Sequence, residues 1–432
     1  MIRKWMVLAI AAGAALTLQA DDDVSRRDRL RQVPAKTFPG RVHLLPATPD
    51  TVQWGWFDNS EPPVLTIKPG DTVVMETMMH SHNQIVPGVS IEQIRTLRID
   101  NPGRGPHSVT GPVYVEGAEP GDVLKVRINR IVPRAYGVNF NLPGMLGQFP
   151  GEFPEGQVRY FYLDTRRMVT EFAPGIEIPL APFPGILGVA RAEPGKYSTV
   201  PPGPFGGNMD IRELKEGTTL YVPVFVPGAL LWSGDSHAAQ GNGEVNLTAI
   251  ETAFKELSLT VDVVKGKSLE WPRIETPTHW ITMGADPDLN HALAILLDET
   301  AMFLSEQRGI SLNAARTLLP QVSDCRVAEV VNQSKALYCM NAKDWKMVKL
   351  QPLAARETPR NFITIGEHAD LQKAMDVASM AMIEALHQKK GLTRLDAYSL
   401  ASLTMDCRLG NPTADVQRVH CFVPKSLWVK KN

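Results

Sequence analysis

The sequence lacks the features that mark several common classes of protein. Acidic and basic residues nearly cancel among its 432 residues, so the formal net charge is −1, and no long run of one charge occurs. This balance argues against a nucleic-acid or other polyanionic partner. The sequence also lacks H-E-x-x-H, the G-x-S-x-G nucleophile elbow, the phosphate-binding loop and the dinucleotide fingerprint. Nothing in it therefore supports a serine triad or a cysteine nucleophile.

Long hydrophobic runs are scarce, and the run near the start of the chain is short. It spans residues 5–18, follows Arg3 and Lys4, and precedes the small-residue stretch "LQA" and the acidic "DDD". This order is typical of a secretory signal. The sequence therefore predicts a signal peptide over 1–20, a periplasmic or secreted mature protein, and no stable membrane anchor after cleavage. An uncleaved anchor is the alternative.

Cysteine is also scarce, and the four cysteines all lie beyond residue 320. An even number of cysteines in an exported chain indicates disulfides rather than a metal or catalytic role. Cys325 and Cys339 are separated by as many residues as Cys407 and Cys421. We therefore expect the bridges Cys325–Cys339 and Cys407–Cys421, although four cysteines allow three pairings.

The C-terminal part repeats itself at an offset of 82 residues. The stretch "ETPTHWITMGADPDLNHA" from Glu275 aligns without a gap with "ETPRNFITIGEHADLQKA" from Glu357, and the alignment superimposes both cysteine pairs. Each copy has the hydrophobic pattern of a strand, two helices and two closing strands. The sequence therefore predicts a tandem α+β repeat, with copies at 271–350 and 351–432.

Capping signals place the predicted helices within each copy. Asp286 and Pro287 predict the N-cap and first position of a long helix in the first copy. Gly309 ends that helix, as Gly391 ends its counterpart. In the second copy "TRLD", beginning at Thr393, is a capping-box pattern for the next helix.

Residues 21–270 contain many short apolar or alternating runs punctuated by glycine and proline. The "PGD" turns at 69–71 and 120–122 lead into such runs, and regularly spaced short strands predict a sandwich or barrel. The expected fold is thus mainly β in a sandwich- or barrel-like catalytic region, followed by the α+β repeat. Two Pro- and Gly-rich stretches, 143–156 and 173–208, are expected to be irregular loops with a functional role.

The stretch "SGDSHAAQGNGEV" at 233–245 places polar side chains among small residues. Asp235, His237, Gln240 and Glu244 stand beside alanines and glycines that leave room for a ligand. Imidazole and carboxylate groups suit zinc or a similar divalent ion, and they also serve as general acids and bases. The alternative is a Gly-rich turn that carries solvent-exposed polar groups.

Three other stretches carry candidate groups with plainer alternatives. "FGGNMD" at 205–210 ends in Asn208 and Asp210, which also suit Asx-type turns. "HSVTGPVYVEGAEPGD" at 107–122 contains His107 and Glu116, and a single histidine is more often structural than a ligand. "HSH" at 80–82 resembles a metal motif but equally suits a polar rim along a strand, so it ranks below the others.

Taken in order, these stretches resemble the motifs of the acetamidase/formamidase family. "HSVTGPVYVEGAEPGD", "FGGNMD", "LYVPVFVPGALLWSGDSHAAQGNGEV" and "ETPTHWITMGADPDL" follow the family's order, and the match runs from about residue 40 to 345. The resemblance implies hydrolysis of a small linear amide such as formamide or acetamide to ammonia and a carboxylate. It also implies a bound divalent metal, for which zinc is expected and calcium is the alternative.

The resemblance assigns roles to the candidate residues: metal ligands Asp210, Asp235 and His237; catalytic residues Asn208, Gln240 and Glu244; and substrate contacts His107 and Glu116. The family pattern reads "GDGHAAQGDGE", so Ser236 and Asn242 depart from it. If that aspartate supplies a charge the reaction needs, Asn242 removes it. The second repeat copy is also extra relative to the family's usual C-terminal part.

Two further expectations follow from the whole sequence. A rival to the enzyme is a non-catalytic exported β-sandwich protein that binds a ligand without chemistry, which the altered Ser236 and Asn242 favour slightly. Because one repeat copy can pack on the other as two subunits would, we also expect a homo-oligomer.

Overall fold

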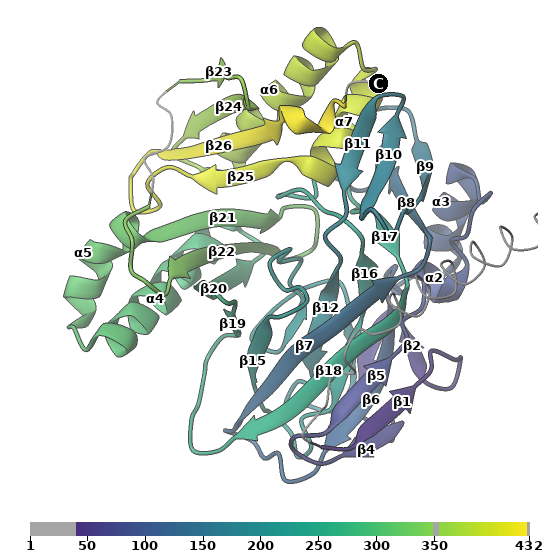
Figure 1. Cartoon of the computed structure of the whole chain (residues 1–432), viewed down its shortest axis with the longest axis vertical. Helices are drawn as coiled ribbons and strands as arrows, with labels where there is room; N and C mark the ends of the chain where they lie inside the picture. Colours follow the sequence, from purple (N-terminus) through teal and green to yellow (C-terminus); the bar gives the residue numbers. More distant parts are fainter. Residues whose placement is uncertain (1–39, 349–353, 430–432) are drawn as a thin grey trace, which may run out of the picture. The chain divides into compact units, whose positions relative to one another are not determined.

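Two large β-sheets form the framework of the part of the chain that the structure describes, residues 40–348 and 354–429 (Figure 1). The structure is a computed structural model of the whole chain, and the predicted signal peptide at 1–20 lies outside the described residues. A mostly β fold with an α+β C-terminal region confirms the predicted class at this level. Over the described ranges, none of the helices is long and apolar enough to cross a membrane.

The larger sheet has 13 strands and runs through both parts of the chain. Its first half holds, in spatial order, β1 (Val42–Leu45), β5 (Thr72–Met75), β18 (Phe254–Val264), β7 (Val123–Pro133), β15 (Thr219–Pro223) and β19 (Arg273–Glu275). Buried apolar residues alternate with more exposed polar ones along β7, where Val126 and Ile128 flank Arg127. This period of two directs one face of the sheet into the core.

The smaller sheet has nine strands: β14 (Gly206–Asn208), β12 (Phe183–Val189), β16 (Leu231–His237), β17 (Glu251–Thr252), β8 (Tyr136–Asn141) and β9 (Gln157–Tyr162), with β2 (Val52–Trp54), β4 (Leu65–Ile67) and β6 (Ser108–Val115) beside them. One apolar core contains side chains of both sheets, among them Met75 and Leu124 from the larger and Leu187 and Trp232 from the smaller. The two sheets therefore bury each other's apolar faces.

The structure differs from the prediction that 173–208 is an irregular loop. This stretch contains β12, in which every residue is buried, and β12 pairs antiparallel with β16. Glycine is required in β12 because a Cβ on Gly188 would lie 2.4 Å from the backbone nitrogen of Gly207. The glycines thus mark close strand packing rather than a loop. The other stretch, 143–156, is irregular as predicted.

The C-terminal region consists of two segments with the same order of elements (Figure 1). The first holds β20 (His279–Asp286), α4 (Leu289–Arg308), α5 (Leu312–Val322), β21 (Ser323–Glu329) and β22 (Lys335–Ala342). The second holds β24 (Asn361–His368), α6 (Leu371–Lys390), α7 (Arg394–Thr404), β25 (Asp406–Leu409) and β26 (Gln417–Pro424). The predicted strand–helix–helix–strand–strand order is confirmed in both segments, and α4 and α6 pack on the strands of their own segment.

Most predicted helix ends agree with the structure. Gly309 and Gly391 adopt the left-handed conformation at the ends of α4 and α6, and the Thr393 side chain caps α7. The predicted N-cap of α4 is wrong by two residues. Asp288 accepts the first backbone N–H bonds of the helix, whereas the Asp286 carboxylate accepts one from Asp288.

The two C-terminal segments join the larger sheet into one continuous ladder. Strand β21 pairs antiparallel with β25 at Arg326 and Arg408, which are separated by the same 82 residues as the aligned copies. Their guanidinium groups share the Asp324 carboxylate at 2.6 and 3.1 Å. When matching positions of two units face each other across antiparallel strands, the two units are related by a local two-fold axis.

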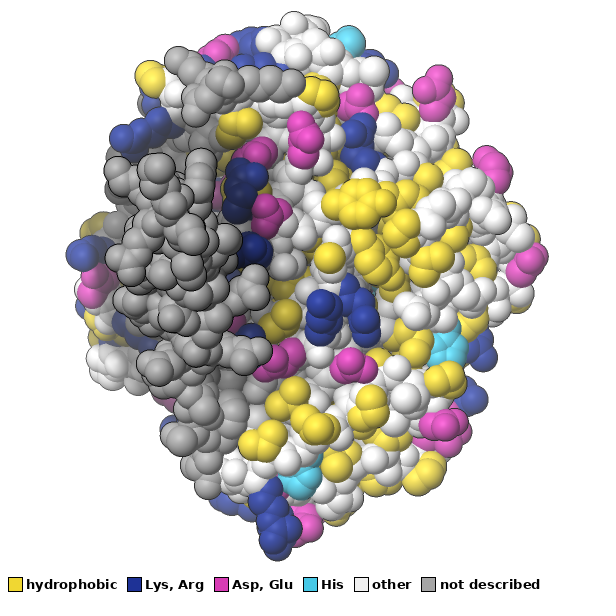
Figure 2. Space-filling model, turned by 45° about the vertical axis from the view of Figure 1, so that its right-hand side comes forward, with side chains coloured by type: hydrophobic (Ala, Val, Ile, Leu, Met, Phe, Trp, Pro, Cys, Tyr) yellow, Lys and Arg dark blue, Asp and Glu magenta, His cyan; other side chains and the backbone are white. Residues whose placement is uncertain are grey.

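Short elements complete the described chain: β3 (Trp56–Asp58), α2 (His80–Asn83), α3 (Ile91–Asp100), β10 (Val169–Ala173), β11 (Ile176–Pro179), β13 (Lys196–Ser198), β23 (Arg356–Glu357) and a 3-10 turn (Lys425–Leu427). Figure 2 shows one face of the molecule, on which acidic and basic side chains lie intermingled. This surface agrees with the near-zero formal charge.

The cysteines pair as predicted, Cys325 with Cys339 and Cys407 with Cys421. Each bridge links opposite residues of two neighbouring antiparallel strands. All four side chains are buried in the same apolar core, so the bridges act as internal cross-links of the two segments.

Replacement of Cys407 and Cys421 by alanine is expected to lower the free energy of unfolding by about 2–4 kcal/mol, because the bridge restricts the unfolded chain. Urea unfolding of the oxidised variant and the wild type measures this loss. The matched comparison is wild-type protein with and without reductant. Equal unfolding midpoints with and without reductant would contradict a stabilising role for either bridge.

Candidate active site

The end of β16 brings the polar side chains of the 233–245 stretch into the interior. Every residue from 231 to 246 is buried, so the alternative of a solvent-exposed Gly-rich turn is wrong. Strand β12 lies on one side of β16, with Phe183 opposite His237, and β17 lies on the other, with Glu251 opposite His237. The pairing of these strands places Glu251 beside the predicted ligands.

His237 stands among three carboxylates. Its Nε2 lies 3.3 Å from Asp235 Oδ2 and 3.2 Å from Glu251 Oε2, and its Nδ1 lies 3.7 Å from Asp210 Oδ1. The edge of its ring meets Phe183, with ring centroids 5.1 Å apart. The structure thus brings together the three predicted metal ligands and adds Glu251.

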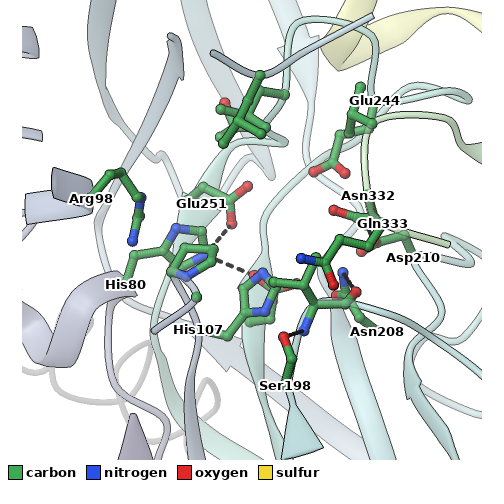
Figure 3. Close-up of a pocket in the computed structure, with 18 of the residues that line it drawn as sticks. His80, Arg98, His107, Ser198, Asn208, Asp210, Glu244, Glu251, Asn332 and Gln333 are labelled. Atoms are coloured by element: carbon green, nitrogen blue, oxygen red, sulfur yellow. Dashed lines mark hydrogen bonds and ion pairs between the residues drawn. The ribbon is translucent and has the colours of Figure 1, made fainter. Parts of the chain in front are cut away.

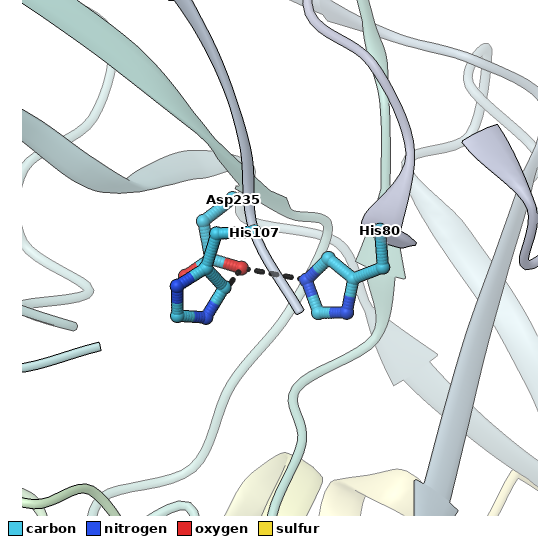
Figure 4. A group of neighbouring side chains, drawn as sticks. All are labelled: His80, His107 and Asp235. Carbon is cyan, nitrogen blue, oxygen red and sulfur yellow. Dashed lines mark hydrogen bonds and ion pairs between the residues drawn. The ribbon is translucent and has the colours of Figure 1, made fainter. Parts of the chain in front are cut away.

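Asp235 also contacts two further histidines (Figure 4). Its Oδ1 lies 2.7 Å from His80 Nε2 and 3.8 Å from His107 Nε2. His80 Nε2 also lies 3.1 Å from Glu251 Oε2. His80 belongs to the "HSH" stretch, which the sequence ranked below the other candidates, and it lies closer to Asp235 than His107 does.

Several polar atoms of this cluster are buried without a hydrogen-bond partner among the described residues. They include both ring nitrogens of His237, Asp210 Oδ1, Glu251 Oε2 and Asn208 Oδ1. Unpaired buried polar groups are costly, and native proteins rarely leave several of them together. Three groups of donor atoms, each within 4.8 Å of one another, can hold a metal ion: His80, His107 and Asp235; Asp210, His237 and Glu244; and Asp235, His237 and Glu251.

Burial and neighbouring charges divide the carboxylates into two types. Burial would raise the pKa of Asp235, but its close contacts with His237 and His80 outweigh burial and hold this pKa well below its usual range. Burial would also raise the pKa of Glu251, but His237 and His80 outweigh burial and lower this pKa to about 2. Burial raises the pKa of Glu244 well above its usual range, and the negative charge of Asp210 adds to this effect. The surroundings therefore favour the ionised forms of Asp235 and Glu251 and the protonated form of Glu244.

The histidines differ in the same way. Burial lowers the pKa of His107 to about 4, so this ring is neutral. Burial also opposes protonation of His80, but Glu251 and Asp235 outweigh it and raise the pKa to about 9. Position relative to the two ionised carboxylates thus decides the charge of each ring.

Three residues of the cluster have a strained backbone. Asp210, Asp235 and Glu244 adopt φ angles of 50°, 49° and 50°, in the left-handed region that non-glycine residues avoid. Such conformations cost on the order of 1–3 kcal/mol each and persist where the surrounding fold imposes them, often at functional sites.

The cluster lines a cavity of about 260 Å³ (Figure 3). Five predicted site residues line it: His107, Asn208, Asp210, Asp235 and Glu244. The lining also includes Arg98, Glu251, Asn332 and Gln333, which the sequence did not single out, and His80, which it ranked low. His237 lies behind Asp235 and Glu251, within the cluster itself.

Two predicted residues lie outside the cavity wall. Glu116 is exposed just beyond the end of β6, and the structure does not bring it to the cluster. It fails to reach the site because the turn after β6 carries it to the surface. Gln240 is buried, and its Nε2 donates to the backbone carbonyl of Asp210 at 3.3 Å. Gln240 therefore fixes the backbone of Asp210 and does not contact the cavity.

The loop between β21 and β22 supplies one wall of the cavity. Asn332 Nδ2 donates to Asp210 Oδ2 at 3.2 Å. Glu329, which is fully buried, accepts the backbone N–H groups of Val331 and Asn332 at 3.0 Å and fixes the start of this loop. No motif in the sequence distinguishes this loop, because its role depends on the packing of the C-terminal region against β16.

Helix α7 of the second C-terminal segment holds the loop that follows β16. Gly241 N donates to Ser402 O at 2.7 Å, and Asn242 N donates to Met405 O at 2.6 Å. The Tyr398 hydroxyl donates to Val245 O at 2.5 Å. The segment that carries Glu244 is therefore anchored to a helix more than 150 residues away in sequence.

Replacement of Tyr398 by phenylalanine removes the hydroxyl that bonds Val245 O and receives the Phe149 N–H. Since these backbone groups stay buried, we expect a loss of about 1–3 kcal/mol in the free energy of unfolding. Tyr162→Phe is the matched control, because the Tyr162 side chain is 82% exposed. Equal unfolding midpoints in urea for the two variants would show that α7 does not anchor this loop.

One family model, described as the Acetamidase/Formamidase family, matches residues 49–194 and 190–416. Among curated relatives, an acetamidase of Mycolicibacterium smegmatis is 29% identical over 265 residues, which cover 48% of this chain and 64% of that protein. A formamidase of Methylophilus methylotrophus is 26% identical over 256 residues, which cover 47% of this chain and 62% of that protein. The matches thus span less than two thirds of the length of these relatives.

Solved structures give a similar result. An acetamidase from Bacillus halodurans matches with a TM-score of 0.64 and 30% identity over 70% of this chain and 98% of that chain. An acetamidase from Yersinia enterocolitica matches with a TM-score of 0.65 and 28% identity over 72% of this chain and 94% of that chain. A gamma lactamase from Delftia acidovorans, at 20% identity and a TM-score of 0.61, shares the fold over 88% of this chain and 89% of its own. Because the family model spans most of the described residues, the chain belongs to the acetamidase/formamidase family.

Proposed function

We propose that this protein is an exported, metal-assisted amidohydrolase that converts a small linear amide and water to ammonia and a carboxylate. The observation that carries the proposal is the buried cluster of Asp210, Asp235, His237 and Glu251 beside a cavity, with several polar atoms left without partners. Family membership adds the reaction class, since the relatives named above are acetamidases and formamidases.

The donor set fits a divalent ion. Imidazole nitrogens and carboxylate oxygens are common ligands of zinc, whereas calcium takes oxygen ligands. We propose Asp210, Asp235 and His237 as the residues that would hold the ion. Glu251 offers a further donor beside Asp235 and His237, and Asp210 forms a second donor group with His237 and Glu244. A bound ion would supply Lewis acidity to the amide carbonyl and to water. Zinc is therefore the metal that we favour.

Glu244 is suited to give a proton to the departing nitrogen. Amide nitrogen is a poor leaving group until it is protonated, so the reaction needs an acid at this point. Glu244 lies in the cavity wall, and burial together with the nearby Asp210 raises its pKa, which favours the protonated form. After the C–N bond breaks, the Glu244 carboxylate can take a proton back from water.

Asn208 is suited to orient the amide. Its Nδ2 donates to Val200 O at 3.1 Å, while its Oδ1 has no partner. The free group is an acceptor, so it fits the N–H₂ of the substrate better than it fits a developing oxyanion, which needs a donor. Gln240 contributes by holding the Asp210 backbone rather than by contact with the cavity.

The two departures from the family pattern leave the chemistry of the cavity intact. Ser236 Oγ shares a hydrogen bond with Thr77 Oγ1 at 2.7 Å. Asn242 Nδ2 donates to the backbone carbonyl of Cys407 at 3.2 Å, in the second C-terminal segment. An aspartate at this position would place a carboxylate oxygen next to that carbonyl oxygen. Because both are acceptors, this contact requires the amide N–H₂ of asparagine. Neither residue lines the cavity.

Export and duplication complete the proposal. Two buried disulfides suit an oxidising compartment, which agrees with a signal peptide at 1–20 and a periplasmic or secreted location. We infer that the second C-terminal segment arose by duplication of the first, from the 82-residue offset and the facing pair Arg326 and Arg408. A homo-oligomer remains a prediction, and it would have to use a surface other than the β21 edge, which β25 covers.

Purified mature protein is expected to hold about one divalent ion per chain and to release ammonia from formamide or acetamide. His237→Ala should lose both properties, because it removes the central donor of the cluster. Elemental analysis and an ammonia assay on both proteins measure this. Normal amide turnover by the variant would contradict the mechanism. If the wild type has neither metal nor turnover, the alternative of a non-catalytic binding protein is favoured.

Gly185→Ala tests whether the cluster requires its present geometry. A Cβ at Gly185 would lie 2.5 Å from Asp235 Oδ2 and 2.7 Å from Asp210 Oδ1, so the variant must displace a predicted ligand. We expect a loss of amide turnover of about tenfold or more, together with weaker metal retention. Gly151→Ala is the control, because a Cβ there meets no atom within 4 Å. Equal turnover by the two variants would contradict the assignment.

A further inference from the structure

Arg98 lines the same cavity and belongs to no part of the proposed reaction. Its Nη2 is buried and has no hydrogen-bond partner, and no carboxylate of the described residues lies within ion-pair distance of the guanidinium. Burial lowers its pKa to about 10, at which the group is still protonated at neutral pH. The cavity wall therefore contains a positive charge without a protein counter-ion.

Two other half-buried guanidinium groups among the described residues are paired. Arg326 contacts Asp324 at 2.6 Å and Glu213 at 3.1 Å. Arg212 contacts Asp406 at 3.1 Å. A buried charge without a partner is unfavourable, and a ligand that brings an opposite charge removes this penalty. Arg98 is thus the exception that a bound anion would explain.

The fold fixes Arg98 in this position. Helix α3 begins with a capping box at Ser90, and Ile94 is fully buried against Val138 and Phe140 of β8. Arg98 follows Ile94 by four residues, so the two side chains lie on the same face of the helix. Phe140 also lines the cavity, so the face that packs on β8 is continuous with the cavity wall. The guanidinium is therefore directed inward by packing.

Arg98 lies across the cavity from Asn208 and Glu244, the groups proposed to orient and protonate the amide nitrogen. Figure 3 shows it on one side, beside His80 and Glu251, with Asp210, Asn332 and Glu244 on the other. The cavity volume of about 260 Å³ also exceeds the need of a two-carbon amide, since one water molecule takes about 30 Å³. A substrate with two polar ends fits this arrangement.

We propose that the substrate is a small amide that also carries a carboxylate, and that Arg98 is the specificity residue that binds this carboxylate. The inference rests on the proposed amidase function. A guanidinium presents parallel N–H donors that match the two oxygens of a carboxylate, which favours this anion. The amide end would then lie near Asn208 and Glu244, where the C–N bond is cleaved.

The test compares succinamate with butyramide, which match in length and differ in the terminal carboxylate. Wild-type protein should have a higher kcat/KM for succinamate, and Arg98→Gln should lower the ratio of the two kcat/KM values by about 10- to 100-fold, as expected for a charged hydrogen bond. Arg98→Lys keeps the charge but not the paired donors, so its ratio of kcat/KM values should lie between those of the wild type and Arg98→Gln. Arg95→Gln is the control, because Arg95 lies on the same helix with its side chain exposed.

Three results would overturn the inference: a wild-type preference for butyramide, an equal loss for both amides in Arg98→Gln, or an equal change in Arg95→Gln. Calorimetric binding of succinamate separates this inference from the amidase proposal. If neither amide is cleaved but succinamate binds the wild type and not Arg98→Gln, the amidase proposal fails and the carboxylate site stands. If butyramide is cleaved and succinamate neither binds nor reacts, the amidase proposal stands and the carboxylate site fails.

Discussion

The site depends on one buried carboxylate, that of Asp235, shared among three imidazole rings. A charge in the interior is stable only where several groups compensate it, and His80, His107 and His237 all lie within 3.8 Å of this carboxylate. His80 lies in α2, His107 directly precedes β6 and His237 ends β16, so the compensation requires these parts of the chain to meet. The arrangement of the smaller sheet and the charges of the cavity therefore depend on each other.

The second C-terminal segment takes part in that constraint without touching the cavity chemistry. Helix α7 holds the loop that carries Glu244, and the carbonyl of Cys407 receives the amide of Asn242. This contact gives a physical reason for the departure from the family pattern at Asn242. Asn242 lies at the contact with the second C-terminal segment, so an aspartate there would place its charge at this contact and not in the cavity wall.

The sequence could reveal Asp210, Asp235 and Glu244 because charged residues among glycines and alanines are unusual in a chain that otherwise alternates. It could not reveal Glu251, which follows an ordinary apolar stretch and joins the cluster only through the pairing of β17 with β16. Arg98 and Asn332 were missed for the same reason, since helix packing and loop placement bring them to the cavity. Local patterns likewise predicted the helices and disulfides, but they misjudged β12, where glycine serves close packing between strands.

The facing pair Arg326 and Arg408 has a consequence for how the active-site loop is maintained. Two separate chains that met through such a pair would part on dilution, since their association depends on concentration. Here both members belong to one chain, so the contact is intramolecular and its effective concentration is set by the connecting residues. The anchoring of the loop by α7 is therefore independent of how much protein is present, so the geometry of the cavity does not change on dilution.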